Sequence, residues 1–159
     1  MNNYGIDIWG DDNFVIENGL VKINHSNKPS LISIVKDIRD KGNKGPLTLR
    51  FPHLTIKQIN KLYNAFNKSI EEYDYSGNFN AVFPLKVNQL PNFIHPMLNN
   101  IKSLNYGLEA GSKAELFIAM AYNNNNAPIT VNGFKDKDMI TLGFIAKQQG
   151  HDITLTLEG

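Results

Sequence analysis

The sequence contains no cysteine in its 159 residues. A disulfide framework, a thiolate metal site and a cysteine nucleophile are therefore excluded within these residues. The absence fits a reducing cytoplasm, where we expect the protein to reside. Histidine does not compensate, because the four histidines are scattered without the spacing of a metal-ligand pair, and no metal site is expected. They lie at positions 25, 53, 95 and 151.

An excess of charge of one sign and long apolar runs are also missing. Sixteen basic and fifteen acidic residues leave a formal charge of +1, without a basic stripe or an acidic tail. A nucleic-acid partner is therefore not expected. No stretch approaches the roughly 18 apolar residues of a membrane span. The start also lacks the basic and apolar regions of a signal peptide, so we expect no membrane partner.

What the chain does contain is 42% hydrophobic residues, enough for a globular unit with a real core. Up to residue 24 it carries short β-type runs. Ile6 and Ile8 alternate, and a tight hairpin turn is predicted at residues 17–19, between runs at 14–16 and 20–23. After a polar linker, Pro29 is expected in the first turn of a helix that ends at Gly42.

From residue 46 the pattern changes to alternating strands and helices. Strands are predicted at residues 46–51, 80–88, 105–110, 128–131 and 152–157. Between them we expect a long helix capped by Thr55, a short helix broken or bent at Pro96, and helices at 112–122 and 136–149. Residues 123–126 are predicted to form a loop of four asparagines.

This alternation predicts an α/β fold with a mostly parallel sheet. Two architectures compete, a doubly wound open sheet and part of a (β/α)8 TIM-type barrel. No Gly-x-Gly-x-x-Gly follows a strand, and no phosphate loop ending in Gly-Lys-Ser or Gly-Lys-Thr occurs, which weakens nucleotide-binding functions. A barrel takes about 250 residues and eight strands. Only five strands are predicted, so we expect the chain to be a fragment.

One lysine stands out inside the predicted strand at residues 80–88. Because a strand alternates its faces, Val82, Pro84 and Lys86 share one face, which puts a primary amine among apolar neighbours. A desolvated lysine can act as a nucleophile and form a Schiff base with an aldehyde. The alternative is a strand-end lysine whose stem packs on the protein while its amine reaches solvent.

Ligands of parallel α/β folds bind at the carboxyl ends of the strands. There, Glu109 could hold the ammonium of Lys86 or pass its proton; equally, it could be a carboxylate near the positive end of a helix. His53 could be a ligand or a base, but a single histidine after a proline is more often a polar loop residue. The residues predicted at the strand ends are Pro52, His53, Lys86, Asn88, Gln89, Glu109, Gly111, Asn132 and Gly133.

Other charged residues near these ends have structural explanations. Ser112 and Glu115 have the spacing of a capping box at a helix N-terminus. Asp136 and Asp138 are typical of a first helical turn, where the helix dipole favours negative charge. Lys135 is expected to be solvated.

Three motifs, in order, resemble those of biosynthetic arginine decarboxylases. They are FPLKVNQ at residues 83–89, YGLEAGSKAE at 106–115 and VNGFKD at 131–136. The stretch YGIDIWG at residues 4–10 resembles the N-terminal signature of the same family. The resemblance covers essentially the whole chain. The family belongs to the fold-type III decarboxylases, together with the ornithine and diaminopimelate enzymes.

The resemblance implies a function and a site. Members of the family convert L-arginine to agmatine and CO2 for polyamine and spermidine biosynthesis, using pyridoxal 5′-phosphate. Lys86 matches the lysine that binds this cofactor covalently, and Glu109 matches an acidic residue near that lysine and the cofactor. Magnesium is a further cofactor that the resemblance allows. A cytoplasmic homodimer or larger homo-oligomer is implied, with active sites at the subunit interfaces.

The resemblance also implies a domain organisation. Residues 1–28 would belong to a split β-domain, and residues 29–159 would form the N-terminal part of a pyridoxal-phosphate-binding (β/α)8 barrel, with about five β/α units. The family's glycine-rich phosphate loop, acidic partner of the pyridine nitrogen and cysteine-plus-aspartate motif would all lie beyond residue 159. Phe83 replaces the tyrosine more usual in its motif.

We therefore expect the chain to be inactive when isolated. Two alternatives remain open. The chain could be a non-catalytic barrel remnant or interaction module, or part of a decarboxylase for a related basic amino acid.

Overall fold

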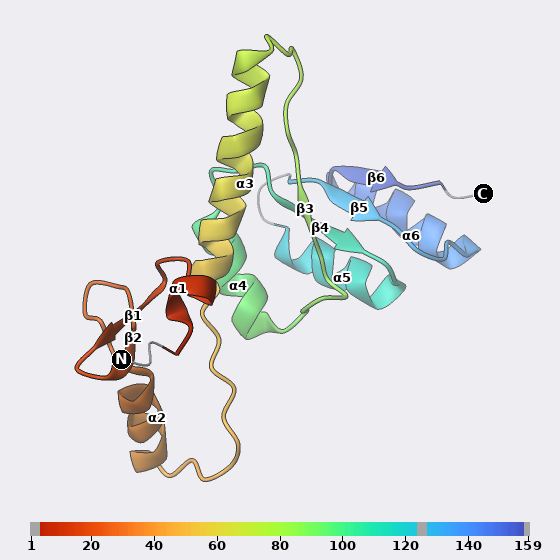
Figure 1. Cartoon of the computed structure of the whole chain (residues 1–159). Coiled ribbons are helices and arrows are strands. Elements are labelled where there is room, and N and C mark those ends of the chain that lie inside the picture. The colour runs from red at the N-terminus through yellow and green to blue at the C-terminus, as the bar shows by residue number, and fades with distance from the viewer. Residues whose placement is uncertain (1–3, 124–126, 158–159) are drawn as a thin grey trace. The chain divides into compact units, whose positions relative to one another are not determined.

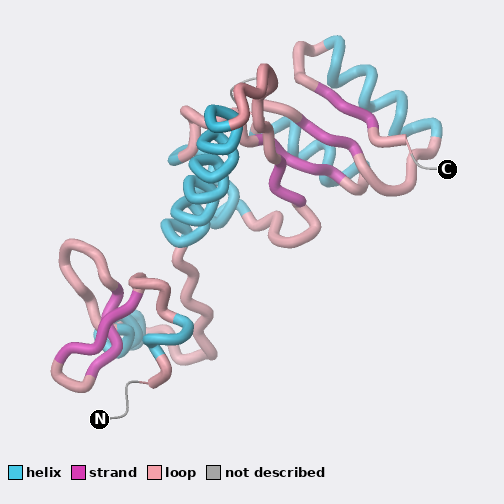
Figure 2. The backbone as a smooth tube through the Cα atoms, turned by 45° about the horizontal axis from the view of Figure 1, so that its top comes forward, coloured by secondary structure: helices cyan, strands magenta, loops and turns pink. Residues whose placement is uncertain are grey.

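A computed structural model describes residues 4–123 and 127–157 of the chain. Residues 124–126 of the predicted asparagine loop lie outside the described ranges. The chain divides into two compact units, Met1–Arg50 and Phe51–Gly159, and each is described by itself. Figures 1 and 2 show the helices and strands of both units. The predicted division of the larger fold into residues 1–28 and 29–159 stays a prediction.

The first unit contains a short helix, a hairpin and a second helix: α1 (Ile6–Trp9), β1 (Phe14–Glu17), β2 (Leu20–Ile23) and α2 (Leu31–Asp40). The predicted hairpin is confirmed, with β1 and β2 antiparallel and Glu17 opposite Leu20. Asn18 and Gly19 have φ values of 54° and 73°. Positive φ at both central residues is the geometry that a two-residue hairpin turn requires, and Asn-Gly supplies it at low cost.

The β-type run predicted at Ile6 and Ile8 is wrong, because these residues lie in α1. The amides of Ile8 and Trp9 both donate to the carbonyl oxygen of Gly5, which closes a helical turn. Ile6 is buried but Ile8 is 91% exposed. The alternation of apolar residues therefore does not correspond to a strand with one buried face.

Helix α2 is confirmed, but its start lies later than expected. Ser30 is the N-cap and accepts a hydrogen bond from the amide of Ser33. Pro29 consequently precedes the helix instead of occupying its first turn. The helix ends at Asp40, and Gly42 follows with a φ of 91°, as expected for a glycine after a helix C-terminus.

The strand predicted at residues 46–51 does not form. The alternation behind the prediction is present, since Leu47 and Leu49 are half-buried while Thr48 and Arg50 are exposed. A strand also needs a neighbour to take its backbone hydrogen bonds. Within the described ranges no strand pairs with this segment, and the regular structure resumes with a helix at Pro52.

The second unit alternates helices and strands. Its elements are α3 (Pro52–Glu72), β3 (Val82–Pro84), α4 (Pro91–Asn100), β4 (Gly107–Ala110), α5 (Lys113–Tyr122), β5 (Ile129–Val131), α6 (Lys137–Gln148) and β6 (Ile153–Leu155). The four strands form one sheet in the order β3-β4-β5-β6, and every neighbouring pair is parallel. The predicted α/β class and parallel sheet are therefore confirmed.

The strand order has a consequence for the two faces of the sheet. Right-handed crossovers between strands that follow one another without reversal put the connecting helices on the same face. Figure 1 shows α5 and α6 along one side of the sheet. On that face the strand side chains are buried with the helices in one core, which includes Leu85, Leu108, Ala110, Ile129, Val131, Ile94, Met97, Leu116, Ala119 and Met139.

The opposite face, which we call the open face, is less buried. The strand register puts Pro84, Glu109, Thr130 and Thr154 in one row across it. The first three are half-buried and Thr154 is exposed. Glu109 therefore projects away from the helices, on the side of the sheet where a ligand can approach.

Helix α3 begins at Pro52, in the first helical position, so the predicted cap at Thr55 is wrong and Thr55 lies inside the helix. Among its apolar residues, Ile59 is buried, whereas Phe66 is 45% exposed. The buried hydroxyl of Tyr63 accepts a hydrogen bond from the amide of Ala81 at 3.2 Å, which ties α3 to the residue before β3.

The ring of the buried Tyr63 lies 6.2 Å, centroid to centroid, from the ring of Tyr106, which is half-buried. Burial raises the pKa of Tyr63, and burial together with the nearby Tyr63 raises the pKa of Tyr106 to about 12.

Helix α4 runs through Pro96 without ending there. In the part of the chain that the structure describes, no helix has the length and apolar character needed to cross a membrane.

Candidate functional site

Strand β3 is shorter than the predicted strand at residues 80–88. It ends at Pro84, although the amide of Leu85 still donates to the carbonyl oxygen of Glu109 at 3.0 Å. The amide of Val87 then donates back to the carbonyl of Pro84, also at 3.0 Å, and closes a turn. Because the backbone bonds to itself there, the strand cannot continue to residue 88. Lys86 therefore lies in a turn after the strand.

The turn exposes Lys86, and Leu85 beside it is fully buried. Of the two sequence-based alternatives, the strand-end lysine that reaches solvent is the one present in this unit. No described residue forms a hydrogen bond or ion pair with the Lys86 amine. The amine is accessible to an aldehyde at the carboxyl end of β3, the edge where parallel sheets bind ligands.

Glu109 lies on the neighbouring strand, β4, opposite Pro84. It is half-buried, and its Oε1 accepts a hydrogen bond from Nδ2 of Asn132 at 3.4 Å. The structure thus brings together two of the residues predicted at the strand ends, Glu109 and Asn132. Lys86 and Glu109 share this edge of the sheet, but no hydrogen bond or ion pair joins them in the described unit.

The loop after β4 is organised by Ser112 and Glu115. The Ser112 hydroxyl accepts from the amide of Glu115 at 3.2 Å and caps α5, as predicted. The Glu115 carboxylate accepts from the amide of Gly111 at 2.7 Å, one residue earlier than in a standard capping box. Both residues therefore have a structural role at this helix end.

The loop after β5 is held by its own polar groups. Oδ1 of Asn132 accepts from the amide of Gly133 at 2.8 Å, and the Lys135 amine donates to the Gly133 carbonyl at 2.5 Å. The expectation of a solvated Lys135 is therefore wrong, because this half-buried side chain folds back onto its own loop. Gly133 has a φ of 77°, and a Cβ atom there would lie 2.8 Å from the carbonyl oxygen of Gly111.

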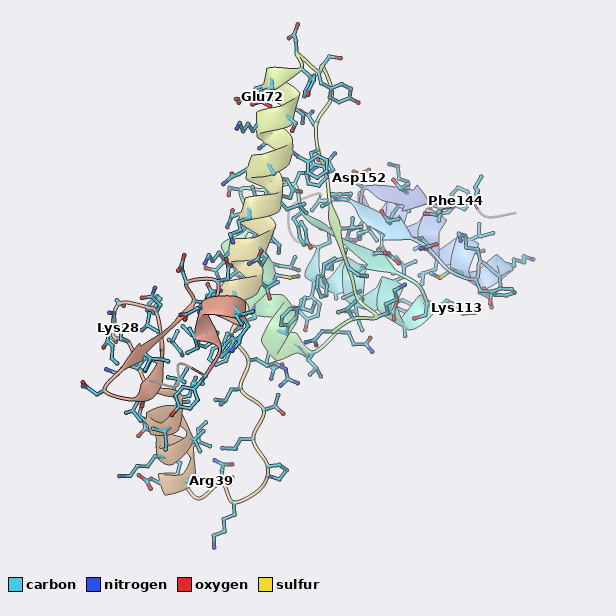
Figure 3. The ribbon with its side chains drawn as sticks, viewed as in Figure 1. Lys28, Arg39, Glu72, Lys113, Phe144 and Asp152 are labelled. Atoms are coloured by element: carbon cyan, nitrogen blue, oxygen red, sulfur yellow. The ribbon has the colours of Figure 1, made fainter. Side chains whose placement is uncertain are left out.

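An ion pair that sequence analysis missed joins the starts of α5 and α6. The Lys113 amine lies 2.7 Å from the Asp136 carboxylate, which also accepts from the amide of Met139 at 2.8 Å and caps α6. The Lys113 hydrogen bond holds the pKa of Asp136 below its usual value, and Asp136 raises the pKa of Lys113. Figure 3 labels Lys113 at its end of α5.

The sequence indicates part of this arrangement. Lys113 and Asp136 both lie in motifs that directly follow predicted strands, so the edge that they share could be inferred. Their direct contact depends on the spacing of two helices, which the sequence pattern does not specify. His53, in contrast, lies in the first turn of α3 with Pro52, and not at the end of a strand. In the described ranges no three acidic or histidine side chains gather as a metal site would require.

Comparison with known proteins shows extensive similarity to one family. No family model matches the chain. The chain is 34% identical over 164 residues to the biosynthetic arginine decarboxylase of Prochlorococcus marinus strain MIT 9301, with 99% of the chain and 25% of the relative covered. Its counterpart in strain MIT 9515 is 35% identical with the same coverage. The chain thus spans about a quarter of the length of these curated relatives.

A solved structure gives the same result. The crystal structure of the biosynthetic arginine decarboxylase SpeA from Campylobacter jejuni matches with a TM-score of 0.94 and 62% sequence identity. The match covers 100% of this chain and 27% of that one. At this identity the likeness extends to the sequence and is not limited to the fold.

Proposed function

We propose that this chain forms part of an enzyme that converts L-arginine to agmatine and CO2, because its whole length is similar to about a quarter of the length of biosynthetic arginine decarboxylases. The conversion belongs to polyamine biosynthesis. The single observation that carries this proposal is the 62% identity to the Campylobacter jejuni protein over the entire chain. The accessible amine of Lys86 at the carboxyl end of β3 supports it independently.

We also propose that the sheet is part of an eight-stranded barrel. A doubly wound sheet reverses its strand order at a switch point, whereas the order β3-β4-β5-β6 has no reversal. Helices on one face and a half-buried open face are the arrangement of a barrel wall. The remaining strands would pair with β3 and β6, the two edges of this sheet. A split β-domain, a homo-oligomer with shared active sites and a cytoplasmic location complete the proposal.

Pyridoxal 5′-phosphate is the cofactor that we propose for this enzyme. The described residues fit one part of it, because an exposed lysine amine can form a covalent bond with its aldehyde. The backbone amide of Gly111, just after β4, is already bonded to Glu115 and is not free to bind the phosphate of the cofactor. When bound, the cofactor supplies an electron sink for the bond to the departing carboxylate.

The residues of this chain have distinct roles in that proposal. Lys86 anchors the cofactor from the turn after β3, and Glu109 holds or moves a proton near that amine. Decarboxylation replaces the carboxylate on the α-carbon of arginine with a proton, so a group that can carry a proton is needed. Asn132 holds one oxygen of Glu109 at 3.4 Å. We infer that residues 1–159 do not decarboxylate arginine when isolated, because the phosphate and substrate contacts would come from elsewhere.

A chimera tests the proposal. Residues 1–159 would replace the matching 27% of the Campylobacter jejuni protein, and agmatine formation from L-arginine would be measured with added pyridoxal phosphate. We expect the chimera to form agmatine and the isolated chain to form none. A folded chimera that is active on lysine or ornithine but not on arginine would contradict the substrate. Agmatine formation by the isolated chain would contradict the inference that it is incomplete.

A further inference from the structure

We propose that Asn132 is a positioning residue that fixes the orientation of the Glu109 carboxylate at the carboxyl edge of the sheet. The inference deepens the proposed function and rests on it, because it gives Glu109 a task at that site. It starts from the contact between Nδ2 of Asn132 and Oε1 of Glu109, at 3.4 Å.

The backbone places the two side chains on the same face. Glu109 pairs with Thr130 in the β4–β5 register, and Asn132 is two residues further along the chain. The amide of Asn132 donates to the carbonyl of Ala110 at 2.9 Å, so the ladder continues to this residue. Residues two apart on a strand share a face, and diagonal neighbours lie within reach of long side chains. The geometry of the sheet therefore directs Asn132 toward Glu109.

A second contact settles which way the amide of Asn132 points. Its oxygen must face a donor, and the amide N–H of Gly133 lies 2.8 Å from it. The NH2 group is then left on the opposite side, toward Glu109. Because the Asn132 amide has a donor on one side and an acceptor on the other, its orientation is the one that satisfies both neighbours.

The turn that carries Asn132 is itself held in place. Gly133 adopts a φ of 77° and packs so closely on Gly111 that a Cβ atom would lie 2.8 Å from the Gly111 carbonyl oxygen. The Lys135 amine holds the Gly133 carbonyl. The scaffold thus extends from the loop after β4 through the loop after β5 to the Asn132 amide. With Oε1 of Glu109 tied by this amide, Oε2 has no hydrogen-bond partner in the described unit and is available to a ligand.

Exchanging donor and acceptor separates this role from a merely structural one. Asn132→Asp keeps an oxygen for the Gly133 amide but puts a carboxylate against Glu109. Combining Asn132→Asp with Glu109→Gln restores a donor–acceptor pair in reverse. The matched control is Asn105→Asp. Asn105 donates to Oδ1 of Asn80 at 2.9 Å, and both residues precede their strands, at the amino ends of β3 and β4.

The test uses the active chimera with the Campylobacter jejuni protein and measures three quantities: the thermal midpoint, kcat and KM for arginine, and the fraction of Lys86 trapped with pyridoxal phosphate by borohydride. We expect Asn132→Asp to lower the midpoint and to reduce kcat about tenfold with a smaller change in KM, since a hydrogen bond to a charged group is lost. The exchanged pair should recover the midpoint but not kcat, and Asn105→Asp should change neither. The fraction of Lys86 trapped should be smaller in Asn132→Asp than in Asn105→Asp.

Two results would overturn the proposal. One is equal behaviour of Asn132→Asp and Asn105→Asp in all three measurements. The other is failure of the exchanged pair to recover the midpoint, or folding, that Asn132→Asp loses, which would limit Asn132 to shaping the Gly133 turn. If the unmodified chimera folds but forms no agmatine, while the exchange still recovers the midpoint, the contact stands and the proposed function fails.

Discussion

The end of β3 and the ends of β4 and β5 are organised in opposite ways. After β4 and β5, polar side chains bond to backbone groups and to one another: Ser112, Glu115, Asn132, Lys135 and the pair of Lys113 and Asp136. After β3, a backbone turn presents Lys86 to solvent without a side-chain partner among the described residues. The difference indicates a rigid scaffold beside one accessible amine. Such a division suits a residue that must form and release a covalent bond.

The largest difference between the two regions should appear when Lys86 is replaced. We expect Lys86→Met in the active chimera to reduce agmatine formation on the order of 10³-fold or more, because the covalent anchor is lost. The free energy of unfolding should change by no more than about 0.5 kcal/mol, as for other exposed sites. Lys102→Met removes another exposed lysine and should leave both quantities unchanged. A strong loss of stability in Lys86→Met would contradict the conclusion that the Lys86 side chain makes no stabilising contact in the described unit.

Gly133→Ala should have the opposite profile, with stability as the main loss. The comparison variant is Gly150→Ala, because Gly150 also has a positive φ, 95°, but nothing lies within 4 Å of its added Cβ. We expect Gly150→Ala to cost about 1 kcal/mol from backbone strain alone. Gly133→Ala should cost about 1–3 kcal/mol more, because its Cβ also meets the Gly111 carbonyl. Urea unfolding measures both, and equal costs would show that the loops after β4 and β5 are not tightly packed together.

A smaller effect is expected at the cap of α5. Ser112→Ala removes the acceptor for the Glu115 amide and should lower the free energy of unfolding by about 1 kcal/mol. Ser112→Asn keeps an acceptor at the N-cap and should stay close to the unmodified protein. Chemical denaturation of the two variants measures this difference. If both lost the same stability, the serine would matter for something other than the cap.

The smallest effect concerns the ion pair of Lys113 and Asp136, which is exposed to solvent. Asp136→Asn keeps a capping oxygen but removes the charge, so it tests the ion pair together with the charge-assisted bond from the Met139 amide. The lowered pKa of Asp136 means that its contribution to stability is present above about pH 3.8 and is lost as the pH falls below that value. The raised pKa of Lys113 means that the contribution of the pair to stability persists below about pH 10.5 and is lost as the pH rises beyond that value.

Thermal midpoints of the unmodified protein and Asp136→Asn should therefore differ slightly near pH 7, converge at acid pH and come closer together at alkaline pH. Salt should reduce the difference, because exposed pairs are screened. A difference that grows at acid pH would contradict this account.

The features that sequence analysis predicted correctly depend on neighbours in the chain. Asn18 and Gly19 specify their hairpin turn, and Ser112 specifies the start of α5, because a single local hydrogen bond or φ value decides each of them. The parallel sheet also followed from local patterns, since strands separated by helices must cross over in the same direction. The candidate residues Glu109 and Asn132 lie at one edge for the same reason.

The features that sequence analysis missed depend on what a segment meets in space. The segment at residues 46–51 alternates like a strand but has no paired neighbour among the described residues, and Ile6 and Ile8 alternate inside a helix. The exposure of Lys86 depends on the turn made by Val87 and Pro84. The contact of Lys113 with Asp136 depends on how two helices are spaced. Patterns along the chain carry no information on these distances.

The central claim is that Lys86 is the accessible amine that anchors the cofactor. It is tested most directly by incubating the chimera with pyridoxal phosphate, reducing with borohydride and mapping the labelled peptide by mass spectrometry. The account predicts that the label lies on Lys86 and that excess L-arginine, added before reduction, displaces it. Label on a different lysine, with Lys86 unmodified, would contradict the account.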